Sequence, residues 1–525
     1  MAENNKNYNH IPKEKFAFVN AGERLTDQKF EDKPIGYFKD AWIRFRKSKA
    51  SVVATVIIVL IIMYAFLFPL CVTTHDHTFM VNLYAKKPAR IAALAEYGIF
   101  DGGVERDFSE KGLIKNVAIG IGAEDWAGEG ISLEQGMESE YQPMNKIGDA
   151  KTIIGPGKKE SKNYTCEIDT YLEVGFFYRS IPQSELAKIQ AWEEETGKKV
   201  LYPLIEDNKW NMDAQDANYW YKSSKGTPVV LDSDGMATTV EFGEGMVLED
   251  NYKRDANGDP IYYEYTGGGT LETAQLKVRV LYYNYYQYLY GFTPDYIMGT
   301  DTQGYDLALR IAGGIKLSLM VAVFVCVINF VLGAMYGAVE GYYGGTVDIV
   351  LERISDILAN VPFIVVATLF QIHLSAKLGP IPCLLFAYVV TGWIGTASRV
   401  RTQFYRFKTQ EYVMAARTLG ARDRRIIWKH IFPNSLGTII TSAALAIPST
   451  MLSESNLSFL GIVKLGTAET TSLGTLLSDA STIWTNYPHL MIYPAIVISL
   501  LMICFNLFGN GLRDAFNPAL RGVEE

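Results

Sequence analysis

Two short clusters of polar residues have spacings that could hold a metal ion. Residues 255–259 alternate carboxylate and amide oxygens as in a calcium-binding loop, but that loop needs glycine where Pro260 stands, which favours a turn. His75 and His77 could pair, yet two imidazoles do not complete a protein metal site. The sequence has no GxxxxGK(S/T) loop, HExxH pair or GxSxG elbow. It therefore predicts no catalytic residue, no metal and no cofactor on this chain.

A third set of carboxylates has helical spacing. Asp348, Glu352 and Asp356 recur at i, i+4 and i+8, opposite an apolar face. Carboxylates at membrane depth can form a proton or ion relay. A solvated helix face is the interpretation that the sequence favours.

Residues 411–434 form a charged, helix-forming segment between two hydrophobic runs. The pattern predicts a helix over 412–420, whose one face carries Tyr412, Val413, Ala416, Leu419 and Gly420. Small side chains let a foreign surface approach closely, and Gly420 suits a left-handed helix end. The basic residues here and just upstream are Arg399, Arg401, Arg406, Lys408, Arg417, Arg422, Arg424, Arg425 and Lys429. They predict a cytoplasmic location, where the segment either docks a soluble partner or lies on anionic lipid.

This segment resembles the coupling motif of ABC-importer permeases, which reads EAA, three residues, glycine, nine residues, then an apolar–leucine–proline ending. The matching residues are Ala415, Ala416, Gly420, Ile431, Phe432 and Pro433. Met414 replaces the glutamate, His430 occupies the apolar position and Phe432 replaces leucine. The oligopeptide and dipeptide permease version, EYV–AAR–LGA followed by HI–PN, is closer. In that family the helix sits in a groove of the cytoplasmic ATPase.

The resemblance implies a coupling helix at 411–424 and a set of ATPase-coupling residues. These are Glu411, Tyr412, Ala415, Ala416, Arg417, Leu419, Gly420, Arg424 and Arg425. Other family motifs follow in order over 299–525: Gly299-Thr300-Asp301, Gly304 and Asp306, Gly344 to Asp348, Asp356 to Leu358, Pro362, Thr391 to Trp393, Arg399, Glu454, Leu457 to Gly461, Asn506-Leu507, Gly511 to Asp514 and Pro518. Tyr305 stands where the family has arginine.

Hydrophobic runs predict an α-helical, polytopic membrane protein with six transmembrane helices, which the resemblance identifies with a type I ABC importer permease. The runs cover residues 51–72, 311–339, 357–375, 381–397, 435–452 and 490–508. Residues 1–49 form a polar cytoplasmic segment that ends in an interfacial helix, where Phe38, Ala41, Trp42 and Phe45 recur with helical spacing. Residues 50–72 form the first span, and 299–525 hold the other five. Both termini are then cytoplasmic, in a multi-pass protein of a bacterial cell membrane.

Residues 73–298 form an inserted domain that this topology places outside the cell. Its 36 acidic and 22 basic residues make nucleic acid an unsuitable partner. A mixed α/β fold is expected, with helices at 84–97 and 184–196, strands at 199–205 and 275–280, and turns at Asp234-Gly235 and Asn257-Gly258. The tyrosine-rich tract 281–290 suits a protein contact, a peptide path or the outer lipid boundary. Only Cys166 falls clearly in this domain, which excludes an internal disulfide.

The resemblance implies a permease subunit of an ATP-driven peptide importer rather than an enzyme. Its implied partners are a second permease subunit, two cytoplasmic ABC ATPases that carry ATP and Mg, an extracellular peptide-binding lipoprotein, the peptide substrate and membrane lipid. Nickel permeases share these motifs, so nickel remains an alternative cargo. A membrane receptor or sensor with a ligand-binding outer domain is the alternative from another class.

Overall fold

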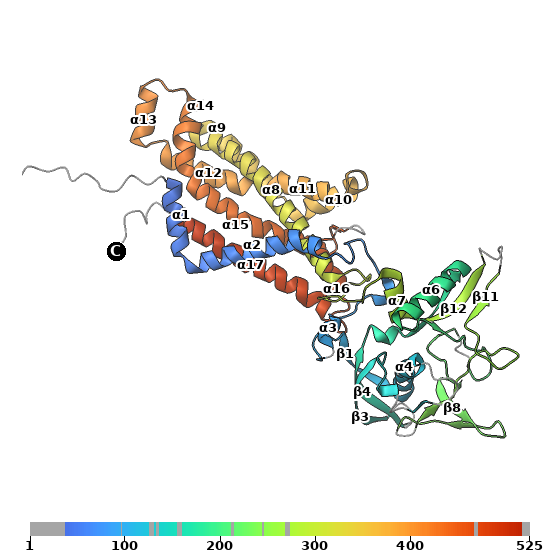
Figure 1. The fold of residues 1–525 in the computed structure, drawn as a ribbon. Helices are drawn as coiled ribbons and strands as arrows, with labels where there is room; N and C mark the ends of the chain where they lie inside the picture. The colour runs from blue at the N-terminus through green and yellow to red at the C-terminus, as the bar shows by residue number, and fades with distance from the viewer. Residues whose placement is uncertain are drawn as a thin grey trace, which may run out of the picture.

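The computed structural model describes residues 37–95, 97–124, 131–132, 136–154, 160–211, 215–243, 246–267, 274–466 and 471–516. Most of the predicted N-terminal segment, and Pro518 of the last motif, lie outside these residues. The chain forms an elongated helical bundle and a mixed α/β domain attached to one end of it (Figure 1).

The bundle contains α1 (Tyr37–Lys47), α2 (Lys49–Cys71), α8 (Leu307–Tyr343), α9 (Gly345–Ala359), α10 (Phe363–Leu378), α11 (Pro380–Thr391), α12 (Ile394–Phe407), α13 (Glu411–Thr418), α14 (Asp423–Arg425), the π-helical turn η4 (Ile426–Ile431), α15 (Phe432–Phe459), α16 (Leu473–Ala480) and α17 (His489–Phe516). Within the part of the chain that the structure describes, five helical segments are long and apolar enough to cross a membrane. These are α2, α8, α11 with α12, α14 with α15, and α17. The predicted first, second, fifth and sixth runs coincide with α2, α8, α15 and α17.

The third predicted run, 357–375, is not one straight helix. It crosses a 69° bend between α9 and α10. Pro362 lacks a backbone N–H and disfavours helical geometry at the residue before it, which breaks the helix there. A sixth span exists if this bent pair crosses the membrane once, so the count of six stays a prediction.

Glycines bring α8 and α12 into close contact. A Cβ on Gly333 would come within 2.6 Å of the Trp393 carbonyl oxygen, and a Cβ on Gly337 within 2.2 Å of the Ala397 oxygen. Side chains larger than hydrogen would therefore push the two helices apart.

The predicted helix before the first span is present as α1. Ala41 and Phe45 are buried against Ala515 near the end of α17, whereas Trp42 is exposed. The helix thus packs one face on the bundle and leaves an aromatic side chain free to meet another surface.

The inserted domain is built from small antiparallel sheets with helices packed on them. Its elements are η2 (Asn82–Tyr84), α3 (Ala92–Ala95), β1 (Gly103–Ser109), α4 (Glu110–Ala123), β2 (Ile131–Ser132), β3 (Met144–Ile154), β4 (Glu160–Asp169), η3 (Leu172–Val174), β5 (Phe176–Pro182), α6 (Gln183–Thr196), β6 (Leu201–Tyr202), β7 (Ser223–Ser224), β8 (Thr227–Leu231), β9 (Ala237–Thr239), β10 (Val247–Leu248), β11 (Tyr263–Tyr265), β12 (Gln275–Leu281) and α7 (Tyr282–Tyr290). The described sheets have strand orders β1-β4-β3, β11-β12-β5 with β6 also on β12, β7-β8-β9 and β10-β2.

Several predictions for this domain are confirmed and others are wrong. Helix α6 ends at the predicted Gly197, although Pro182 rather than Ser184 precedes its first turn. The Asp234-Gly235 turn joins β8 to β9, and the Asn257-Gly258 turn is closed by a bridge between Arg254 and Pro260. The predicted helix at 84–97 is wrong, because Pro88 interrupts it and only η2 and α3 form. Strand 199–205 shrinks to β6.

The tyrosine-rich tract supplies three side chains to the core, a role that was not predicted for it, while Tyr290 at its end is 41% exposed. Tyr282, Tyr285 and Tyr286 on α7 are buried in one cluster with Tyr84 and Tyr296. The phenols are amphipathic, and the helix turns their rings inward onto the β11-β12-β5 sheet rather than toward a partner or lipid.

The two ends of the insert meet at a single seam above α8. Arg90 and Tyr296 exchange backbone hydrogen bonds of 2.9 and 2.8 Å. The Asp301 carboxylate then organises the entry to α8, accepting from the backbone N–H of Tyr305 at 3.0 Å and from Arg310 Nε at 3.2 Å. These residues of the first family motif therefore join the insert to the bundle.

Candidate coupling site

Helix α13 lies at the end of the bundle away from the inserted domain (Figure 1). Glu411 in its first turn and Arg417 in its last turn complement the helix dipole. Gly420 has φ +82° and donates its N–H to the Arg417 carbonyl at 2.9 Å, while the N–H of Ala421 bonds to Ala416 at 3.0 Å. The predicted left-handed cap at Gly420 is confirmed.

The predicted helix face is divided in the structure. Val413 is fully buried among residues of α12 and η4, so it anchors α13 and is unavailable to a partner. Tyr412, Ala415 and Gly420 are exposed, and Leu419 is 86% exposed. Ala416 is half-buried. The surface open to another protein is therefore the side that carries Ala415 and Leu419.

Tyr412 is exposed and is also hydrogen-bonded to α15. Its hydroxyl accepts a hydrogen bond from Asn434 Nδ2 at 3.3 Å. Partial burial raises the pKa of the Tyr412 phenol, which keeps the side chain neutral at physiological pH.

The predicted coupling helix at 411–424 is too long. The helical path stops at Thr418, turns at Gly420, and restarts as α14 before the π-helical turn η4 leads into α15. Ile426 and Ile431 bury against the cluster that holds Val413. The segment is thus a helix–turn–helix unit whose buried side chains pack on the bundle. We call residues 411–431 the clip.

The charged residues of this clip divide into two groups. The Arg417 guanidinium donates to the Tyr342 hydroxyl at 3.3 Å, and that hydroxyl donates to Asp423 Oδ1 at 2.6 Å. Arg417 therefore binds the end of α8 and is not a free member of the predicted rim. Arg424 and Arg425 are exposed, and they line a shallow open hollow together with Arg422, Trp428 and Lys429.

Arg401 on α12 is a residue whose importance the sequence did not reveal. It forms two hydrogen bonds to the Asp348 carboxylate, at 2.6 and 2.9 Å, and two to that of Glu352, at 2.9 and 3.1 Å. Tyr405 also donates to Asp348 at 2.6 Å. The favoured solvated face is wrong for Asp348, which is buried beneath an arginine from another helix, whereas Glu352 stays partly exposed beside the same arginine. Only Asp356 pairs on the exposed side, with Arg353.

Glu454 of the family pattern is a fully buried carboxyl in α15. Its oxygens accept from Ser318 Oγ on α8 at 2.7 Å and from Ser458 Oγ at 3.0 Å. Hydroxyl donors thus satisfy the carboxyl inside the bundle and link α8 to α15.

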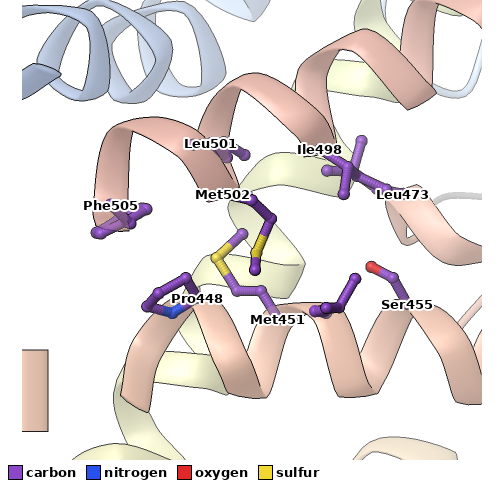
Figure 2. A pocket seen from close by; sticks show the side chains of 9 residues that line it. Pro448, Met451, Ser455, Leu473, Ile498, Leu501, Met502 and Phe505 are labelled. Carbon is purple, nitrogen blue, oxygen red and sulfur yellow. The ribbon is translucent and has the colours of Figure 1, made fainter. Parts of the chain in front are cut away.

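One small cavity in the bundle, between α15 and α17, does not suit a ligand. The gap between α15 and α17 holds about 10 Å³ and is lined mainly by apolar side chains. Figure 2 shows Met451 and Met502 extending into it from opposite helices. Its size is about that of one water molecule, so it is a packing defect.

Comparison with known proteins shows which family the chain belongs to. Residues 330–522 match the binding-protein-dependent transport system inner membrane component family, and residues 36–88 match the N-terminal TM domain of oligopeptide transport permease C. The oligopeptide transport system permease protein OppC of Bacillus subtilis is 39% identical over 228 residues, which are 43% of this chain and 73% of that protein. The chain belongs to this permease family.

A second sequence relative of this permease agrees. The dipeptide transport system permease protein DppC of Bacillus subtilis is 40% identical over 229 residues, 43% of this chain and 70% of that protein. A chain of the inward-facing MetNI methionine ABC transporter aligns with 15% identity and a TM-score of 0.33, over 40% of this chain and 96% of that chain. The family assignment rests on the sequence relatives. The two matched segments leave residues 89–329 of this permease uncovered, which include most of the insert.

The chain is a transport component and not an enzyme, as its family membership indicates. Among the described residues, no group of three or more His, Cys, Asp or Glu side chains is arranged to hold a metal ion. The Asp255 carboxylate instead accepts backbone N–H groups of Asn257 and Asp259, at 2.8 and 2.9 Å, and closes the turn.

Proposed function

We propose that this chain is the permease subunit of an ATP-driven importer of oligopeptides or dipeptides. The names of its relatives, OppC and DppC, support the peptide cargo. A second permease subunit completes the translocation path, because six spans are too few to surround a peptide. The protein is multi-pass in a bacterial cell membrane, contacts membrane lipid and binds no nucleic acid.

The clip that carries α13 is the docking surface for one of two cytoplasmic ABC ATPases, which bind ATP and Mg. The single observation that carries this assignment is Leu419, a large apolar side chain that is 86% exposed on a helix tip flanked by arginines. An apolar anchor rimmed by cations is a surface that a protein partner would cover. Glu411, Tyr412, Ala415, Ala416, Gly420, Arg424 and Arg425 complete the proposed contact, and Arg417 supports it from behind.

The insert and α13 occupy opposite ends of the bundle (Figure 1). A cytoplasmic α13 therefore implies an extracellular insert and cytoplasmic termini. Outside the cell, the insert would receive a peptide-binding lipoprotein that delivers the substrate.

Affinity purification from native membranes, with identification of co-eluting chains, tests the assignment. The wild-type chain is expected to retain ATPase subunits, and Leu419→Glu is expected to lose them by placing a charge on the apolar anchor. Met236→Glu is the matched control, because Met236 is 69% exposed in the inserted domain. ATPase subunits that co-elute equally with all three proteins would refute the docking role. Gly420→Trp should abolish uptake while the protein still inserts.

A second experiment separates the insert from the permease. Because Arg90 and Tyr296 are hydrogen-bonded neighbours, an Asn-Gly turn can replace residues 91–295 without breaking the seam. The shortened chain is expected to keep its ATPases and to bind the lipoprotein less well. Undiminished recruitment of the lipoprotein would assign the insert another role.

A further inference from the structure

A polar cavity of about 290 Å³ lies between α8, α11–α12 and α15. This volume is near the lower end of the range for small-ligand sites, about 300 Å³. It opens on the face of α15 opposite the Met451 gap of Figure 2, since Ser442, Ser449 and Thr450 line it. We call it the α8–α15 hollow. Its position within spanning helices makes a polar lining costly unless the lining serves a guest.

The hydroxyl groups of the hollow present acceptors. Ser442 Oγ donates its proton to the Thr438 carbonyl at 3.0 Å, and Thr450 Oγ1 donates to that of Ala446 at 3.0 Å. Each hydroxyl has one proton, so these oxygens keep only lone pairs for a ligand. A guest that donates N–H groups would match them.

Asn329 on α8 adds an unsatisfied acceptor. The residue is 8% exposed, and its Oδ1 has no hydrogen-bond partner among the described residues, while its Nδ2 donates weakly to the Tyr388 carbonyl at 3.5 Å. A buried acceptor without a hydrogen-bond partner destabilises the folded state. An entering N–H donor would relieve that cost after a small rotation of the side chain.

Arg399 supplies a cation at the edge of the same hollow. It is exposed and has no hydrogen-bond or ion-pair partner within the described ranges, whereas Arg401, two residues on, holds two carboxylates. An arginine with no acidic partner is suited to bind a carboxylate from a ligand.

We infer that the α8–α15 hollow is a peptide subsite of the translocation path. Its acceptor groups receive backbone N–H donors, and Arg399 receives the C-terminal carboxylate. This inference rests on the proposed function, because it names where the cargo contacts this chain. It assigns specificity to Asn329, Arg399 and Thr450, which recognise features common to all peptides rather than particular side chains.

Cys326 provides a built-in reporter, since it lines the hollow and is half-buried, while Cys71 on α2 is exposed elsewhere. The assembled importer is treated with a small thiol-modifying reagent, and modification at each cysteine is followed by mass spectrometry. Trialanine at about four times its Kd is expected to slow modification of Cys326 about fivefold, because only the unoccupied site reacts. Modification of Cys71 should not change.

Variants test the two recognition elements separately. Trialanine amide, which lacks the carboxylate, should protect Cys326 less than trialanine in the wild-type complex. In Arg399→Gln the two peptides should protect equally, and Asn329→Leu should weaken protection by both. ATPase co-elution is measured in parallel to show that each variant assembles.

The outcomes separate this inference from the proposed function. If the complex imports trialanine but Cys326 reacts equally with and without it, the subsite is overturned and the importer assignment stands. Protection without import supports the subsite and refutes transport. Absence of both refutes both. Equal protection by the free and amidated peptides in the wild-type complex overturns the role of Arg399.

Discussion

The core of the inserted domain and the core of the helical bundle are stabilised by different kinds of contact. The insert buries a cluster of tyrosines between α7 and its sheet, whereas α8 and α12 meet through glycines. Among the described residues, most exposed large aliphatic side chains lie on bundle helices such as α2, α8, α9 and α10. Removing aromatic side chains from water stabilises the fold of the insert. In lipid, covering an apolar side chain adds little stability, so close packing of the helix backbones contributes more to the stability of the bundle.

The two regions also differ in how much of their sequence matches the family models. The matched segments cover most of the bundle, where the motif residue Glu454 links α8 to α15. The insert has its own core and is attached at one seam. A change in either core should therefore leave the other region folded.

The largest effect is expected from Gly337→Leu. Its Cβ alone would come within 2.2 Å of the Ala397 oxygen, so α8 and α12 would separate and the bundle would misfold. Fluorescence-detected size-exclusion chromatography in detergent should show loss of most monodisperse protein. Gly313→Ala on the same helix has open space around its Cβ and should be tolerated. Normal yield of the Gly337 variant would contradict the glycine contact.

Tyr286→Ala tests the other core. Tyr286 is fully buried and its hydroxyl lies 3.2 Å from that of Tyr296. Truncation should cost the insert about 3–5 kcal/mol, which limited proteolysis of the full chain would report as faster cleavage within 73–298. Tyr97→Ala, at a 76% exposed position, is the control. ATPase co-elution should persist, and its loss would show that the two cores are coupled.

Arg401→Ala should have a smaller effect confined to α9. The carboxylates of Asp348 and Glu352 would lose their shared partner, at a cost of about 2 kcal/mol for charge-assisted hydrogen bonds. Hydrogen exchange should accelerate in α9. Lysine cannot bridge both carboxylates, so Arg401→Lys should rescue only in part. Arg353→Ala, which removes an exposed pair on the same helix, should leave exchange unchanged.

The smallest effect is expected from Gly258→Ala in the insert. Gly258 has φ +93°, and alanine there should cost about 1 kcal/mol. A domain of this size would then melt about 2–4 °C lower, measured by thermal proteolysis. Gly243→Ala, with open space and no left-handed backbone, is the matched change. Equal melting temperatures of the two variants would contradict the claim that the left-handed backbone at Gly258 disfavours alanine.

The predictions that succeeded depend on local chemistry. Apolar runs located α2, α8, α15 and α17, and glycine located the C-terminal end of α6 and the Gly420 cap. These features depend only on neighbours along the chain, so one sequence suffices to read them.

The predictions that failed depend on what covers a residue. The partner of Asp348 is Arg401, 53 positions away, and no spacing rule connects them. The tyrosines of α7 have one apolar and one polar end, so their pattern suits core, lipid boundary or interface equally. Likewise, the exposed face of α13 could be chosen only after Val413 was seen to be buried in the bundle.

The attachment of α13 has a mechanical consequence. Three residues separate the end of α12 at Phe407 from Glu411, and α12 packs closely on Gly333 and Gly337 of α8. Because this connection is short, a displacement of α13 by a partner bound at Leu419 would be transmitted to α12. Because α8 and α12 are in backbone contact at these glycines, we expect the two helices to shift together when α13 is displaced.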